Sequence, residues 1–106
     1  MSNREEIVAT LPPMHPGEFL REEYLKPLGI APGALAKLCG VPRKRIERIA
    51  AEKLGITGDT AIRLGSVLKT TPELWMNLQS RYEILTARNA AGEAVERLRP
   101  LEHGVA

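Results

Sequence analysis

The chain has 106 residues, 43% of them hydrophobic, and its 15 lysines and arginines exceed its 13 aspartates and glutamates by only two. This length holds one small core, so we expect a single domain, and Cys39, the only cysteine, excludes an intrachain disulfide framework and fits a reducing cytoplasm. Charges and prolines interrupt the first sixteen residues, which favour neither a secretory signal nor a membrane span, so we expect a soluble cytoplasmic protein with no membrane contact.

Prolines, glycines and threonines divide the chain into five helical segments, and no segment alternates for long enough to predict a strand. Pro16 suits the first position of a helix, and we expect this first helix to end where Pro27 and Gly29 stop it. The second segment, residues 32–39, is short and should end at Gly40.

Three further helices follow in the pattern. Pro42 suits the first turn of the third helix, which we expect to run to about Lys53. Thr57 is typical of the N-cap of a fourth helix. Thr71 followed by Pro72 indicates the start of a fifth helix of about five turns, which should be the longest. The sequence therefore predicts an all-α fold.

Positive charge is concentrated between residues 37 and 53. This segment holds six basic and two acidic residues, a local balance of +4, and leaves nine basic against eleven acidic residues elsewhere. At 100° per residue, Ile46 and Ile49 lie together on one side of the third predicted helix, while Lys44 and Arg48 point to the opposite side. A solvated surface helix explains such a face equally well, so charge alone does not decide its role.

The neighbouring residues favour a helix-turn-helix. Ala36 is small enough to let two helices touch, Gly40 suits the tight turn, and Ile46 is an apolar anchor on the next helix. A helix mounted in this way can project into the major groove of DNA. We therefore expect the framework to be Ala36, Gly40, Ile46 and Ile49. We expect Lys44, Arg45 and Arg48 to contact base edges or phosphates of DNA. Arg43 should contact the DNA backbone, and Lys37 and Lys53 should flank the DNA-binding surface.

Nothing in the sequence points to catalysis. Cys39 beside the turn is more typical of a small buried residue than of a nucleophile, and His15 before Pro16 more typical of a helix start than of a base. The sequence has no carboxylate pair, glycine-rich phosphate loop or metal-binding spacing. We expect no catalytic residue, no metal, no cofactor and no small-molecule substrate.

Residues 14–84 contain three motifs together: HPGEFLREEYLKPLGI, LAKLCGVPRKRIERI and TTPELWMNLQSRYEI. With these motifs the segment resembles the HigA-type, or VapI-like, antitoxins of the Xre/Cro repressor group. The resemblance implies a five-helix lambda-repressor-like fold whose recognition helix is Pro42 to about Lys53. It also implies a homodimer on palindromic double-stranded operator DNA at the nucleoid, autorepression of a toxin–antitoxin operon, and neutralisation of a cognate RelE/HigB-type mRNA endonuclease.

One position departs from that family pattern. Where related repressors often place a polar residue for a phosphate contact at the start of the second helix, this chain has Pro32, Gly33 and Ala34. Two other functions stay open: a stand-alone Xre-family transcriptional regulator without a toxin, and a protein-only inhibitor whose cationic helix never meets DNA.

The fifth predicted helix has two apolar sides. The side with Trp75 and Leu85 should pack on the domain. The other side consists of Met76, Ser80, Ile84, Ala87 and Ala91. We expect it to be a dimerisation surface, in preference to a second core face or a toxin-binding site. The predicted parts of the chain are a flexible arm (1–13), a helix-turn-helix domain including the long fifth helix (14–91), and a C-terminal tail (92–106) that either holds a short helix or frays.

Overall fold

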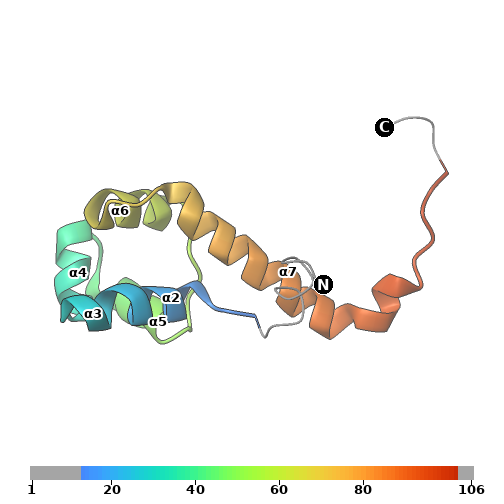
Figure 1. The fold of residues 1–106 in the computed structure, drawn as a ribbon, viewed down its shortest axis with the longest axis horizontal. Coiled ribbons are helices and arrows are strands. Elements are labelled where there is room, and N and C mark those ends of the chain that lie inside the picture. Colours follow the sequence, from blue (N-terminus) through green and yellow to red (C-terminus); the bar gives the residue numbers. More distant parts are fainter. Residues whose placement is uncertain (1–12, 103–106) are drawn as a thin grey trace, which may run out of the picture.

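The computed structural model describes residues 13–102, and all regular elements within this range are helical (Figure 1). In chain order they are α2 (Pro16–Leu20), η1 (Arg21–Leu25), α3 (Lys26–Leu28), α4 (Pro32–Cys39), α5 (Arg43–Ala50), α6 (Gly58–Leu68) and α7 (Pro72–Glu96). Because α2, η1 and α3 follow one another without a gap, they form one helix, and residues 13–102 contain five helices in all. This confirms the predicted all-α, five-helix fold. Apart from Pro13, the expected N-terminal arm lies outside the described residues, as do residues 103–106 of the tail.

The first helix is positioned at its start by contacts to α5 and α7. His15 is the N-cap, and its Nδ1 atom accepts a hydrogen bond from the Gly17 amide at 2.8 Å. The His15 ring lies edge-on to Tyr82 of α7, with 4.9 Å between the ring centroids. Gly17 approaches α5 so closely that a Cβ atom would overlap the carbonyl oxygen of Ile49. The start of the first helix therefore contacts both α5 and α7.

The first helix passes through Pro27 instead of ending there. Arg21–Leu25 form a π-helical turn, after which the Lys26 amide bonds to the carbonyl of Arg21, five residues earlier. This wider turn accommodates Pro27, which has no N–H to donate and whose ring would crowd the preceding turn of a regular α-helix. The prediction that Pro27 stops the helix is therefore wrong. The helix ends at Gly29, which is left-handed with a φ of 61°.

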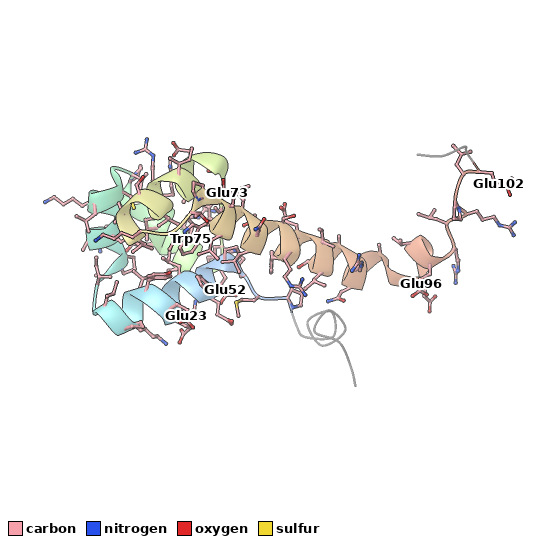
Figure 2. The ribbon with its side chains drawn as sticks, turned by 45° about the horizontal axis from the view of Figure 1, so that its top comes forward. Glu23, Glu52, Glu73, Trp75, Glu96 and Glu102 are labelled. Carbon is pink, nitrogen blue, oxygen red and sulfur yellow. The ribbon has the colours of Figure 1, made fainter. Side chains whose placement is uncertain are left out.

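The core lies between the first helix, α4, α5, α6 and the start of α7. Its centre is Trp75, which has no exposed surface and points into the body of the molecule (Figure 2). The indole Nε1 of Trp75 donates to the Thr70 hydroxyl at 2.7 Å, so its polar atom is satisfied. The buried residues around it are Leu20, Leu25, Leu35, Ala36, Cys39, Ile46, Ile49, Ala50, Ile56, Ala61 and Leu64.

The long helix α7 begins in the body and then leaves it (Figure 1). Its start is as predicted, because the Thr71 hydroxyl accepts a hydrogen bond from the Leu74 amide at 3.2 Å. With 25 residues it is the longest of the described helices, and it is interrupted at Gly92, whose φ of 19° and ψ of −101° are not helical. Some of its apolar side chains are exposed, Ile84 by 50% and Val95 by 49%, whereas Leu85 is buried, as predicted. The described chain is consequently elongated, with extents of 52 × 31 × 24 Å.

Candidate nucleic-acid interface

The turn between α4 and α5 has the geometry of a helix-turn-helix. Gly40 ends α4 in the left-handed conformation, with a φ of 68° that few residues other than glycine adopt. The Gly40 amide bonds to the carbonyl of Lys37 at 3.2 Å, and the Val41 amide bonds to that of Ala36 at 3.0 Å. Ala36 is 1% exposed, which allows the two helices to approach closely. The turn ends at Pro42, whose extended backbone forms the N-cap of α5.

The recognition helix is shorter than the sequence pattern predicts. It comprises Arg43–Ala50, whereas the expected range was Pro42 to about Lys53, so the prediction is wrong at both ends. The C-terminal end is closed by Glu52, which adopts a left-handed φ of 61°, and by the Lys53 amide, which bonds to the carbonyl of Arg48 at 2.8 Å. Glycine is the usual residue in such a position, so the sequence carried no signal for this early end.

Within α5, apolar and cationic residues lie on different sides. Ile46 and Ile49 have no exposed surface and anchor the helix in the core. Lys44 and Arg48 are exposed, as is the side chain of Arg43 at 76%. The fourth cation of α5, Arg45, is only 33% exposed at its side chain. Lys37 at the end of α4 and Lys53 after α5 are both exposed.

Acidic partners engage two of the four cations of α5. Arg43 pairs with Glu47 on the same helix, with 3.2 Å between Nε and Oε2. Arg45 pairs with Asp59 of α6, with 2.6 Å between Nη1 and Oδ2. Lys44 and Arg48 have no ion pair among residues 13–102. Their charge is therefore the least compensated on this helix.

Arg21 supports the C-terminal end of the recognition helix. Its Nη1 atom donates to the carbonyl of Ala50 at 2.6 Å, and its Nη2 atom lies 3.2 Å from Glu52 Oε2. A cation at this position satisfies a terminal carbonyl and complements the negative end of the helix dipole. Figure 2 shows Glu52 beside the first helix. Glu52 therefore pairs with the first helix, 31 residues away in the sequence, a contact that sequence spacing could not indicate.

Two residues of α6 also contact the motif, and sequence reasoning missed both. Arg63 donates from Nη1 to the carbonyl of Cys39 at 2.9 Å and to that of Gly40 at 3.4 Å. Its Nε atom lies 3.1 Å from both carboxylate oxygens of Asp59. The pairing of Arg63 first, and of Arg45 second, holds the pKa of the Asp59 carboxyl below its usual value. The spacing of Asp59 and Arg63 predicts an ion pair on one helix, but not its contact with the turn.

The remaining titratable residues near the motif are packed into the fold. Cys39 is 6% exposed, and burial raises the pKa of its thiol. Burial lowers the pKa of His15. The carboxylate of Glu52 raises this pKa by a smaller amount, and the charge of Arg21 lowers it further.

Among residues 13–102 no group of three potential ligands from His, Cys, Asp and Glu gathers as a metal site. No helix in the same range is both long and apolar enough to cross a membrane.

The residues predicted for dimerisation all lie on α7. Met76 is 38% and Ile84 50% exposed. Ser80 and Ala87 are exposed as well, and Ala91 is half-buried. At 100° per residue the five positions fall within about 80° of one another on the helix. They form one narrow strip, here called the α7 strip, which begins in the second turn of the helix and ends just before Gly92.

Comparison with known proteins identifies relatives of this chain, although no protein-family model matches it. Virulence-associated protein I of Dichelobacter nodosus is 47% identical over 77 residues, which are 73% of this chain and 71% of that protein. Antitoxin HigA-1 of Vibrio cholerae is 35% identical over 89 residues, 84% of each chain. The structure of the Pseudomonas aeruginosa antitoxin HigA with the higBA promoter has a TM-score of 0.81 at 43% identity and aligns 85% of this chain with 99% of that one. With these identities over most of both lengths, the chain belongs to the HigA-type antitoxins, the family that its three motifs resemble.

Proposed function

We propose that this chain is the antitoxin of a type II toxin–antitoxin module. It binds operator DNA as a homodimer through α4 and α5, represses its own operon, and neutralises a cognate RelE/HigB-type mRNA endonuclease. The proposal is carried by one observation: the Pseudomonas aeruginosa antitoxin solved with promoter DNA shares 43% identity and the fold with this chain. The exposed cations of α5 supply the positive charge that a helix needs in a DNA groove.

The proposed DNA contacts follow the exposure of the cationic residues. Lys44 and Arg48 are exposed and have no acidic partner in the described range, so they are the principal candidates for base edges or phosphates. Arg45 is the third candidate, held by Asp59. Arg43, Lys37 and Lys53 are proposed to contact the DNA backbone on either side. At the start of α4 the N-cap Ala31 makes no side-chain cap bond, so a phosphate there would be bound by backbone amides.

Dimerisation is proposed to use the α7 strip. Its exposed apolar and small residues lie on a helix that projects from the body, where a second copy can pack against them along its length. Small residues such as Ser80 and Ala87 allow two helix backbones to approach closely. A twofold pair on operator DNA requires recognition helices about 34 Å apart, the spacing of consecutive major grooves.

The remaining features of the proposal follow from this role. We propose that the chain has no catalytic activity and needs no cofactor, since its relatives are antitoxins and Cys39 is buried. It acts in the cytoplasm at the nucleoid, where its operator lies. The working domain comprises residues 14–91, with residues 1–13 as an arm and 92–106 as a tail.

The proposal is tested by mobility-shift titration against the DNA upstream of its own gene, with and without the product of the adjacent gene. A specific shift, together with rescue of growth when the neighbouring gene is expressed, supports an autorepressing antitoxin. A specific shift without a toxic neighbour would favour a stand-alone regulator. Binding of the toxin with no DNA shift would favour a protein-only inhibitor and contradict the repressor role.

A further inference from the structure

A single carboxylate joins the recognition helix to α6. Asp59 lies in the first turn of α6, two residues after the N-cap Thr57. Its Oδ2 atom accepts a bond from Arg45 Nη1 at 2.6 Å, and both of its oxygens lie 3.1 Å from Arg63 Nε. Arg45 is 14 residues earlier in the chain, so this is a contact between helices. Asp59 therefore interacts with two guanidinium groups at once.

The second guanidinium places Asp59 relative to the helix-turn-helix. Arg63 uses Nη1 to bind the carbonyls of Cys39 and Gly40, which belong to the turn between α4 and α5. The chain of bonds thus runs from the turn, through Arg63 and Asp59, to Arg45. Because charge-assisted bonds of this kind are directional, they restrict where the Arg45 side chain can lie. The position of Arg45 is consequently set by α6 as well as by its own helix.

Arg45 differs in this respect from its neighbour Arg43. The Arg43 side chain is 76% exposed, and its one ion pair among the described residues is with Glu47 on the same helix. The Arg45 side chain is 33% exposed and its partner belongs to another helix. Within residues 13–102, Nη1 is the one side-chain donor of Arg45 with a protein partner, which leaves Nε and Nη2 for a ligand. Arg45 is therefore an oriented donor whose charge is already partly compensated.

We propose that Asp59 is a specificity-determining residue of the DNA interface and acts by positioning Arg45. The inference rests on the proposed DNA binding by α5. An arginine whose charge is partly neutralised by a carboxylate gains little binding free energy from phosphates, which every DNA sequence presents. An oriented guanidinium still donates in a fixed direction, as is needed to read the O6 and N7 atoms of guanine. Asp59 thus favours the operator over other DNA at the expense of total affinity.

The test compares the affinities of Asp59→Asn and the wild type for two duplexes of equal length, the upstream DNA and a scrambled sequence. Fluorescence anisotropy is measured at several salt concentrations. With Arg45 released to bind phosphates, the variant should bind scrambled DNA more tightly, and its log K against log salt should become steeper by about 2 per dimer. The preference for upstream over scrambled DNA should fall by about tenfold.

A matched control separates positioning from simple charge. Glu47→Gln removes the same charge from a carboxylate that pairs with Arg43, so it should strengthen binding to both duplexes alike and leave the preference unchanged. In an Arg45→Ala background, Asp59→Asn should no longer alter the preference, because the residue through which it acts is absent. An equal fall of preference with and without Arg45 would overturn the proposal. So would an unchanged preference in the single variant.

Two further outcomes are distinguishable. If Asp59→Asn loses its helical circular dichroism, the test passes to Asp59→Ser, which also removes the carboxylate but places a residue type favoured at helix starts there. The proposal then requires the same fall in preference and the same steeper salt dependence, and an unchanged preference would refute it. If the wild type itself does not prefer upstream to scrambled DNA, the proposed repressor function fails, and with it the basis for assigning specificity to Asp59.

Discussion

Replacing Gly17 with alanine should destabilise the domain strongly, although alanine is the better helix former. In a solvent-exposed helix this exchange stabilises by up to about 1 kcal/mol. Gly17, however, is buried, and the new Cβ atom would overlap the carbonyl oxygen of Ile49 in the recognition helix. The obstacle is backbone, which cannot rotate away as a side chain can, so α2 and α5 must separate.

The expected cost of Gly17→Ala is about 3 kcal/mol, at the upper end of overpacking penalties and larger than the gain in helix propensity. This is a large share of the roughly 5 to 15 kcal/mol that stabilises a domain. The free energy of unfolding is measured by urea titration, followed by circular dichroism at a fixed protein concentration, since a dimer's stability depends on concentration.

Gly58 at the start of α6 is the matched control. A Cβ atom there meets nothing within 4 Å, so Gly58→Ala should change stability by less than about 1 kcal/mol. If Gly17→Ala were as stable as the wild type or more so, the close packing of α2 on the recognition helix would be refuted. Equal losses in both variants would also contradict the reasoning, because only one of them meets an obstacle.

Three further predictions concern DNA, assembly and pH. Arg48→Ala should weaken operator binding by about 1 to 3 kcal/mol in anisotropy titrations, and a folded variant with unchanged binding would remove Arg48 from the interface. Ile84→Glu, in the middle of the α7 strip, should shift the mass measured by light scattering toward the monomer, whereas a persistent dimer would exclude this surface. Burial lowers the pKa of His15 in the folded state below 6.5, so its contribution to stability is present above that pH and is lost as the pH falls through the lowered folded pKa. The unfolding free energy of His15→Asn, which keeps a capping side chain, should accordingly fall less than that of the wild type between about pH 7 and pH 5, and equal slopes would contradict this.

The starts of α6 and α7 were predictable from the sequence because their signals are local. The Thr57 and Thr71 side chains accept hydrogen bonds from amides three residues ahead, within the same short segment. The end of α4 was predictable for the same reason, since Gly40 is the residue type that a left-handed cap prefers. Such signals need no knowledge of the rest of the fold.

Helix ends that depend on other geometry were not predictable. The first helix continues past Pro27 because a π-helical turn precedes that residue. The residue types in this turn do not distinguish a π-helical from an α-helical turn. The recognition helix ends at Ala50, whose carbonyl is bound by Arg21, 29 residues earlier. Glu52 then takes the left-handed conformation in place of glycine. At the end of the recognition helix, the contact with Arg21 comes from a distant part of the chain and is invisible in the local pattern.

For the candidate site, the helical wheel separated inward from outward residues correctly where the helix is regular. Ile46 and Ile49 are buried, and Lys44 and Arg48 are exposed. The wheel could not show that Arg45 pairs with Asp59, because that contact depends on how α6 crosses α5. Charge patterns therefore predict the exposure of a cation better than the degree to which its charge is compensated.

The central claim is that the outer cations of α5 bind DNA, and one comparison of two double variants tests it most directly. Lys44→Gln with Arg48→Gln is compared, by anisotropy on the upstream duplex, with Lys69→Gln and Arg88→Gln, which remove the same charge from exposed residues of other segments. The α5 pair should weaken binding by about a hundredfold or more, and the other pair by far less. Equal weakening by both pairs would contradict the claim, because binding would then follow total charge and not the face of the recognition helix.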